Sequence, residues 1–191
     1  NEGSQTVADA LRDKILVIGE NRSIRRFQRY EGDIVAYVHG GGRIGVLVRF
    51  DADAACAASE ELQECGKDVA MQIAALNPTY LSKETVPAEA LEKEKEILIS
   101  QIKNDPKNAS KPEQIIHKMV EGRIGKFYEN NCLMQQAFVK NGDITVAQYV
   151  ADMAKKAGGA MQVADYVRFE KGEGLQKRED NFADEVASMM K

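Results

Sequence analysis

The sequence predicts an α+β fold: two related subdomains of antiparallel sheet covered by helices, with an inserted antiparallel coiled-coil helical hairpin. Three observations predict this class. Residues 31–51 alternate between apolar and polar on both sides of a glycine cluster, as the strands of a β-hairpin do. Apolar residues recur at helical spacing over 59–76 and again over 145–157. Between those stretches, two charged segments carry only a narrow apolar stripe, which is typical of a coiled coil.

The domain boundaries are expected where these patterns change. We expect an N-terminal core subdomain at 1–84, a coiled-coil helical hairpin at 85–129, a C-terminal core subdomain at 130–178 and a C-terminal helical module at 179–191.

The first two predicted elements are a helix and a strand. Thr6 can cap a helix that runs to Val17 with apolar residues on one face, and Gly19 stops it. Residues 23–30 alternate as a strand that carries three arginines. These arginines could bind phosphate, or they could form a solvated strand face, and we prefer the second interpretation.

The β-hairpin at 31–51 needs a covering helix, because two strands alone are marginally stable in water. Ser59 can cap that helix, and Asn77 followed by Pro78 ends it. Its apolar face includes cysteine, which we interpret as core filler and not as a metal ligand.

The coiled-coil hairpin is predicted from two helices joined by a short polar turn. The first helix covers residues 87–103, and the chain turns at 104–106. Ser110 and Glu113 have the spacing of a capping box that opens the second helix. The charged outer surface of this hairpin is expected to be solvated.

The second half of the chain repeats the organisation of the first. Residues 122–139 contain a second Arg-Ile-Gly and several apolar residues expected to be extended. Thr145 opens a helix that closes at Gly158, and residues 163–170 alternate as a strand. Asp180 can cap a final short helix. The apolar residues expected to be extended are Cys132, Leu133, Phe138 and Val139.

The composition is that of a soluble globular protein, with 43% hydrophobic and 29% charged residues. No apolar run approaches the roughly 20 residues of a membrane helix, and the first residues lack the order of a signal peptide. The net charge of −4 argues against a general nucleic-acid binder, which usually carries a basic excess. We therefore expect a cytoplasmic protein with no nucleic-acid or membrane partner.

The cysteines and histidines indicate no metal site and no cofactor. Cys56, Cys65 and Cys132 match neither metal-ligand spacing nor a disulfide framework, so we interpret them as reduced thiols. The only histidines are His39 and His117, which are far apart in the sequence.

No catalytic motif is present that would make the chain an enzyme. Residues 39–42, HGGG, also occur as the oxyanion loop of some hydrolases, but that role needs a nucleophile elbow, which the sequence lacks. His39 could be a base, a ligand or a surface contact. With no titratable partner nearby in the sequence, we interpret it as a contact.

Seven blocks carry a resemblance to a known family, and they follow one another in the expected order over nearly the whole chain. The blocks are IGEN with the following IRR at 18–26, EGD at 31–33, HGGGRIGVLV at 39–48, DVAMQIAALNPTYL at 68–81, VEGRIGKF at 120–127, CLMQQAFV at 132–139 and VRFEKGEG at 167–174. On these blocks the chain resembles elongation factor Ts, the nucleotide exchange factor for elongation factor Tu.

The resemblance implies a function without covalent chemistry. Such a factor binds elongation factor Tu and promotes the release of GDP and magnesium. The family normally begins with a small helical domain and a TDFV-type segment whose Asp-Phe pair wedges into the partner, and neither is found in these 191 residues. We therefore expect a fragment that binds elongation factor Tu but exchanges nucleotide weakly.

The resemblance also implies which residues contact the partner. The predicted contacts are Ile18, Gly19, His39, Gly40, Phe182 and Met189. Two of them have an alternative interpretation: Ile18 could instead pack at a helix end, and His39 could be a turn residue satisfied by backbone. A homodimer through the core subdomains is possible.

Two other classes of function stay open. The core could be an interaction module that dimerises or that docks another partner through the coiled coil. It could also dock elongation factor Tu without exchanging its nucleotide. An RNA-associated translation protein could use Arg25, Arg26 and Arg29, and steeply salt-dependent RNA binding would mark it.

Overall fold

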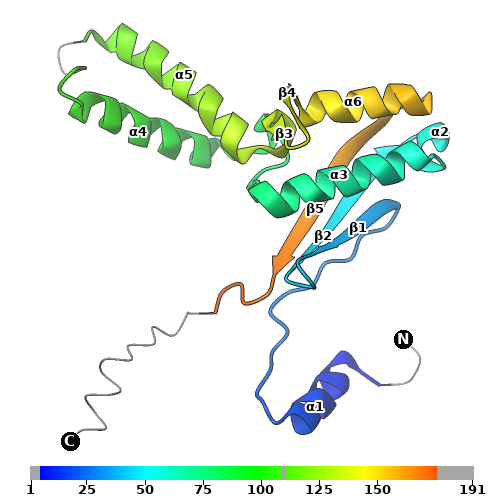
Figure 1. The fold of residues 1–191 in the computed structure, drawn as a ribbon. Coiled ribbons are helices and arrows are strands. Elements are labelled where there is room, and N and C mark those ends of the chain that lie inside the picture. Colours follow the sequence, from blue (N-terminus) through cyan, green and yellow to red (C-terminus); the bar gives the residue numbers. More distant parts are fainter. Residues whose placement is uncertain (1–4, 109–110, 176–191) are drawn as a thin grey trace, which may run out of the picture. The chain divides into compact units, whose positions relative to one another are not determined.

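The computed structural model describes residues 5–108 and 111–175, in two compact units divided between Tyr30 and Glu31. Helices and antiparallel strands occur together (Figure 1), so the predicted α+β class is confirmed.

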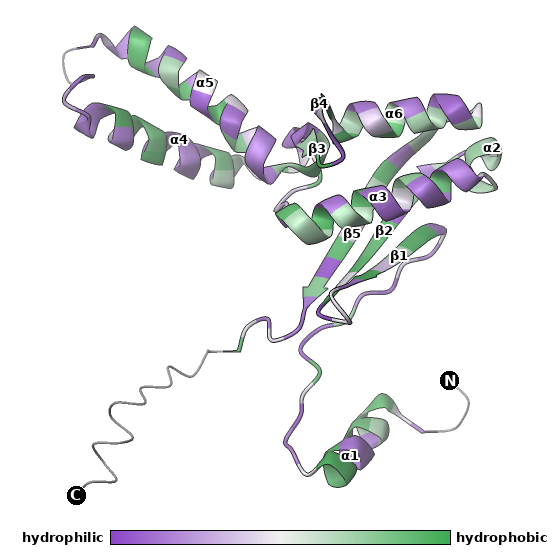
Figure 2. Cartoon of the chain, in the orientation of Figure 1, coloured by the Kyte–Doolittle hydropathy of each residue, from purple (hydrophilic) through white to green (hydrophobic). Residues whose placement is uncertain are grey.

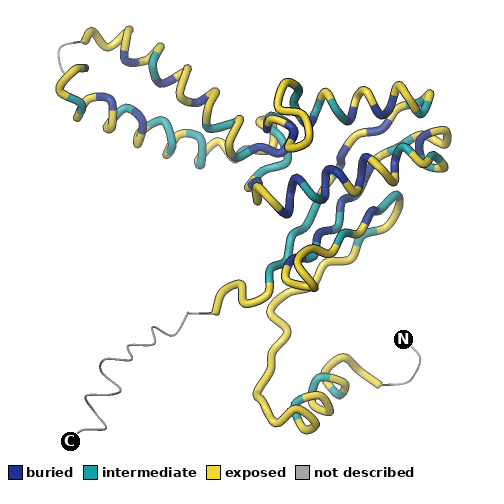
Figure 3. The backbone as a smooth tube through the Cα atoms, viewed as in Figure 1, coloured by how far each residue is buried: buried dark blue, intermediate teal, exposed yellow. Residues whose placement is uncertain are grey.

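The N-terminal unit contains helix α1 (Val7–Ile18), which confirms the helix predicted after Thr6. The Thr6 hydroxyl accepts a hydrogen bond from the Asp9 N–H, and Gly19 closes the helix in the left-handed region with φ 76°. No side chain of α1 is buried, as the exposed colouring in Figure 3 shows.

The strand predicted at 23–30 is wrong. The structure assigns no strand to these residues, and Ile24 and Phe27 are exposed. Alternation of residue types predicts a strand only where a neighbouring strand is available to pair with it. The three-stranded sheet begins at Asp33 and contains no strand from 23–30.

The second unit is built on a three-stranded antiparallel sheet of order β1-β2-β5. The strands are β1 (Asp33–His39), β2 (Ile44–Ala52) and β5 (Met161–Glu170). The predicted hairpin is confirmed as β1 and β2, in a register that pairs His39 with Ile44 and Asp33 with Phe50.

Helices α3 (Glu60–Leu76) and α6 (Val146–Ala157) cover one face of this sheet (Figure 1), and the short α2 (Ala54–Ala57) precedes them. Ser59 caps α3 and Thr145 forms a capping box with Gln148 at the start of α6, as predicted. Asn77 ends α3 with φ 46°, and Gly158 ends α6 with φ 77°.

One core lies between this sheet and its helices, and it joins both halves of the sequence. The strand predicted at 163–170 is confirmed, but it pairs with β2 in the first sheet instead of building a second one. Buried residues of α3, α6 and all three long strands belong to the same cluster. Local patterns predict a strand but not its pairing partner. The second half of the chain therefore contributes β5 to the first sheet, and its separate sheet is only the two-stranded pair of residues 137–138 and 141–145. The domain boundaries stay predictions.

The segment that follows residue 121 differs in part from the extended residues predicted within 122–139. Helix α5 (Glu113–Asn131) continues through the second Arg-Ile-Gly, and a 3₁₀ turn, η2 (Leu133–Gln135), follows it. Of the four residues expected to be extended, Phe138 lies in a strand, within the short pair β3 (Ala137–Phe138) and β4 (Asn141–Thr145). Cys132 is also extended and forms an isolated bridge with Tyr80. Burial of Ile124 against the neighbouring helix outweighs the two flanking glycines.

The predicted helical hairpin is confirmed as α4 (Ala88–Asn104) and α5, preceded by the 3₁₀ turn η1 (Lys83–Thr85). An apolar stripe faces between the two helices (Figure 2), and its buried residues are Leu98, Ile102, Ile116, Val120 and Ile124. Pro112 occupies the N-cap position of α5 with no side-chain cap, and Ser110, predicted to cap this helix, lies outside the described residues. No helix in residues 5–108 and 111–175 is both long and apolar enough to cross a membrane.

Candidate functional site

The six predicted partner contacts fall in three parts of the chain. Ile18 and Gly19 end α1 in the N-terminal unit, whereas His39 and Gly40 lie at the tip of the β1–β2 hairpin in the second unit. Phe182 and Met189 lie outside the described residues, as does the helix predicted after Asp180. We therefore treat the end of α1 and the hairpin tip as two separate surfaces.

The end of α1 exposes an apolar group. Ile18 is 45% exposed, and Leu16 and Val17 are more exposed still. The Gly19 N–H donates to the Ile15 carbonyl, and the positive φ of Gly19 turns the chain sharply after Ile18. An added Cβ at Gly19 would meet no atom within 4 Å, so the glycine serves the backbone conformation and not close packing.

The hairpin tip is shaped by three successive glycines in the left-handed region. Gly40, Gly41 and Gly42 have φ values of 59°, 63° and 92°. An L-residue pays about 1–2 kcal/mol to adopt this conformation, so three in a row are accessible in practice only to glycine. The Arg43 N–H closes the turn by donating to the His39 carbonyl at 3.1 Å and lies 3.3 Å from the Gly40 carbonyl.

The third strand holds the base of the tip. The Lys171 N–H donates to the Arg43 carbonyl at 2.8 Å, just past the end of β5. The Arg43 guanidinium lies 3.5 Å from the Glu170 carboxylate, although this pair is solvent-exposed and contributes little energy. The tip is therefore a defined backbone shape, fixed at both strands and at β5.

The ring of His39 has a partner that the sequence analysis missed. The Tyr37 hydroxyl lies 2.9 Å from His39 Nδ1, and the two ring centroids are 5.9 Å apart. His39 itself is exposed, while Tyr37 is partly buried against the core. The spacing of two along β1 was the available signal, because residues i and i+2 of a strand share a face.

A buried pair of glutamines fixes the β3–β4 segment on α3, and sequence patterns gave no sign of it. The Gln72 side-chain amide donates to the Gln136 side chain at 3.1 Å and to the Ala137 carbonyl at 3.0 Å. The Gln72 side-chain oxygen accepts the Val139 N–H at 2.8 Å. Both glutamines are almost fully buried, so these bonds satisfy groups that water cannot reach.

A second buried polar cluster lies on the same side of α3. The Asp68 carboxylate accepts hydrogen bonds from Lys140 Nζ at 2.6 Å and from the Tyr149 hydroxyl at 2.8 Å. Burial, followed by the bond to Asp68, raises the pKa of Tyr149, so its hydroxyl stays protonated and donates. The Tyr149 ring stacks on Phe138 with centroids 4.1 Å apart. Every polar group here is used by the fold.

The three cysteines are buried and free, which confirms their interpretation as thiols in the interior. Burial raises the pKa of each thiol, in the case of Cys65 to about 12. A thiol in that state is a poor nucleophile and a poor metal ligand. Within the described parts of the chain, no group of three or more His, Cys, Asp or Glu side chains could hold a metal ion.

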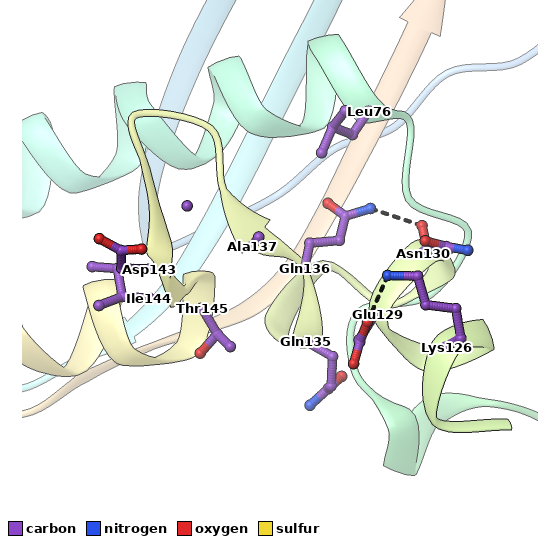
Figure 4. A pocket seen from close by; sticks show the side chains of 11 residues that line it. Leu76, Lys126, Glu129, Asn130, Gln135, Gln136, Ala137, Asp143, Ile144 and Thr145 are labelled. Carbon is purple, nitrogen blue, oxygen red and sulfur yellow. Dashed lines mark hydrogen bonds and ion pairs between the residues drawn. The ribbon is translucent and has the colours of Figure 1, made fainter. Parts of the chain in front are cut away.

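Two surface hollows of about 420 Å³ each lie on the described part of the chain. The first lies where β3–β4 meets the ends of α3 and α5 (Figure 4). Its polar side chains are engaged with the protein, since Lys126 pairs with Glu129 and Gln136 donates to the Asn130 carbonyl. The second lies along the helical hairpin, where Glu92 pairs with Lys95 on its rim. Glu96, His117 and Glu121 also line the second hollow.

Comparison with known proteins gives one consistent result. The family model described as elongation factor TS matches residues 1–173. Elongation factor Ts of Clostridium kluyveri is 46% identical over 189 residues, which is 97% of this chain and 60% of that protein. The Clostridium perfringens protein of the same name is 48% identical over 192 residues, and that of Clostridioides difficile is 47% identical over 188 residues. These alignments cover 98% and 97% of this chain, and 61% and 60% of those relatives.

Proposed function

The chain belongs to the elongation factor Ts family, and we propose that it acts in translation elongation by binding elongation factor Tu and promoting release of GDP and magnesium. The observation that carries this proposal is the match along almost all of the chain, at 46–48% identity to relatives of that name. The chain spans about 60% of the length of those relatives, so their activity and partners come to it only as a proposal.

The geometry of the hairpin tip supports the proposal. A protein that binds a folded partner gains affinity when its contact surface is already in the bound shape. The tip meets this condition, because three glycines, the β1–β2 ladder and the end of β5 hold the backbone that carries His39 and Gly40. We assign the contact with the nucleotide-binding domain of elongation factor Tu to this tip and to Ile18 and Gly19.

The proposed activity requires no catalytic group. The factor would stabilise a conformation of elongation factor Tu that holds GDP poorly, so factor and nucleotide weaken each other's binding by the same ratio. A coupling of about 3 kcal/mol would correspond to about 150-fold. No covalent step occurs in this scheme, and a cytoplasmic location accords with the role.

Calorimetric titration of elongation factor Tu with this chain tests the proposal. We expect binding to nucleotide-free elongation factor Tu, and at least a roughly tenfold larger dissociation constant when GDP and magnesium are present in excess. His39→Ala should weaken binding, while Lys155→Ala, on the exposed side of α6, is the matched control and should not. Absence of binding would refute the proposal.

A second candidate is a module that docks on elongation factor Tu without exchanging its nucleotide. The preformed shape of the hairpin tip suits docking as well as exchange. Binding of equal strength with and without GDP would support docking, because coupling is then absent. Dimerisation through the core is a separate proposal that sedimentation analysis tests.

A further inference from the structure

The side chains of Tyr37 and His39 form one unit at the hairpin tip. Both lie on the same face of β1, where Tyr37 is opposite Val46 and His39 is opposite Ile44. Tyr37 is partly buried and packs against the main core, while His39 is exposed at the end of the strand. The core therefore anchors one member of the pair, and the other projects from it.

The contact of 2.9 Å between the Tyr37 hydroxyl and His39 Nδ1 can have either direction, depending on which ring nitrogen carries the proton. A neutral imidazole has one N–H donor and one acceptor nitrogen, and its other hydrogen bond sets which is which. A Tyr37 O–H that donates to His39 Nδ1 places the proton of the neutral ring on Nε2.

The backbone of His39 is also held in place. Its carbonyl accepts the Arg43 N–H, and its strand position is set by the pairing with Ile44. Among the described residues, Tyr37 is the one side chain hydrogen-bonded to the His39 ring, so Nε2 has no acceptor there. With the ring held at Nδ1, the Nε2–H is a single donor in a defined direction.

We propose that Tyr37 is a positioning residue, which orients the His39 ring and presents its Nε2–H to an acceptor oxygen on the partner protein. This inference rests on the proposed function, because it takes His39 as a contact with elongation factor Tu. Ordering an exposed side chain before binding removes a cost that would otherwise reduce affinity. Tyr37 would contribute in this way without touching the partner.

Nitrogen-detected NMR of the histidine rings tests the orientation without any partner. At about pH 8, where imidazoles are mainly neutral, we expect His39 to show the Nε2–H tautomer alone. Tyr37→Phe should give a mixture of tautomers at His39. His117 is the internal control: within the described chain no hydrogen bond is made to its ring, so a mixture is expected there in both proteins. A His39 spectrum that Tyr37→Phe leaves unchanged would overturn the role of Tyr37.

A double-mutant cycle on partner binding tests the consequence. The side-chain amide of glutamine places an N–H near the position of Nε2, so His39→Gln keeps a donor that needs no imidazole tautomer. We expect Tyr37→Phe to raise the dissociation constant for elongation factor Tu roughly 3- to 10-fold when His39 is present, the size expected for ordering one side chain. On the His39→Gln background the same change should alter it by less than about twofold.

Two controls separate this role from a structural one. Tyr149→Phe removes a hydroxyl hydrogen bond on α6, remote in sequence from the tip, and should leave the dissociation constant unchanged. An equal loss from Tyr37→Phe on both backgrounds would overturn the inference, because it would reflect damage to the hairpin. If the unmutated chain does not bind, the proposed function fails along with the role in binding. The NMR result still decides whether Tyr37 orients the ring.

Discussion

Helix α3 approaches the sheet closely at Gly66, and this contact gives a sharp prediction about stability. Gly66 lies within α3 opposite Val35 of β1. An alanine Cβ at this position would lie 2.6 Å from Val35 Cβ and 3.0 Å from its Cγ1, with Cγ2 closer still. Ordinary carbon contacts are about 3.5–4.0 Å, so the helix or the strand would have to move by about 1 Å.

Two opposing effects set the magnitude of Gly66→Ala. Alanine favours a helix over glycine by about 1 kcal/mol, whereas overpacking a filled core costs about 1–3 kcal/mol. The clash involves a strand Cβ that no rotamer change can move, so we take the upper end of that range. The expected net loss is about 2 kcal/mol in the free energy of unfolding, or roughly 4–8 °C in Tm for a chain of this size.

The same substitution at Gly122 or Gly125 is the matched control. Both glycines lie within α5, and an added Cβ would meet no atom within 4 Å at either one. Alanine there should gain about 1 kcal/mol from helix propensity alone. Urea unfolding followed by far-ultraviolet circular dichroism measures all three variants. If Gly66→Ala stabilises the protein as the controls do, the inferred close packing of α3 on β1 is wrong.

Three further predictions concern polar and backbone features of the second unit. Gln72→Leu should lower the free energy of unfolding by about 3 kcal/mol, because the Val139 N–H and other buried groups lose their partner. Gln63→Leu, on the exposed side of α3, should change it by less than about 0.5 kcal/mol. Equal effects of the two substitutions in urea unfolding would contradict this prediction. The Asp53 carboxylate accepts two backbone N–H bonds, which hold its pKa below the ordinary value of 3.8. The stabilising effect of the Asp53 carboxylate is therefore present above pH 3.8 and is lost as the pH falls through its lower folded-state pKa. The Tm difference between wild type and Asp53→Asn should shrink in acid. A Tm difference that stays constant with pH would refute this linkage. Gly41→Ala should lower the free energy of unfolding by about 1 kcal/mol, because φ of Gly41 is 63°. Gly41→Asn should lower it by less, since asparagine tolerates the left-handed region. Thermal denaturation that ranks the two variants in the opposite order would contradict the turn geometry.

Features specified by neighbouring residues could be predicted from the sequence. The glycine cluster with alternation on both sides marked the β1–β2 hairpin, and the caps at Thr6, Ser59 and Thr145 marked where three helices begin. These features depend on hydrogen bonds between residues that are close in the sequence, so the residue types that form them can be recognised from a single sequence.

Features that depend on distant residues could not be predicted. The pairing of β5 with β2 joins segments more than 100 residues apart, and no local pattern distinguishes it from the start of a second sheet. The strand predicted at 23–30 shows the opposite error. The alternation of residue types is present there, but these residues pair with no strand of the three-stranded sheet. The Gln72–Gln136 bond likewise depends on tertiary burial.

The candidate site shows the same division. His39 and Gly40 were placed by the resemblance of their block, and their backbone shape follows from the adjacent glycines. The contact from Tyr37 needed the strand register before it could be seen. For Phe182 and Met189, which lie outside the described residues, the contact role stays a prediction.

Release of a fluorescent GDP analogue from elongation factor Tu measures exchange by this chain. We expect faster release when the chain is added, a smaller acceleration with His39→Ala, and full acceleration with Lys155→Ala. Binding without acceleration would assign the chain a docking role and contradict exchange by these residues. Absence of both binding and acceleration would contradict the account as a whole.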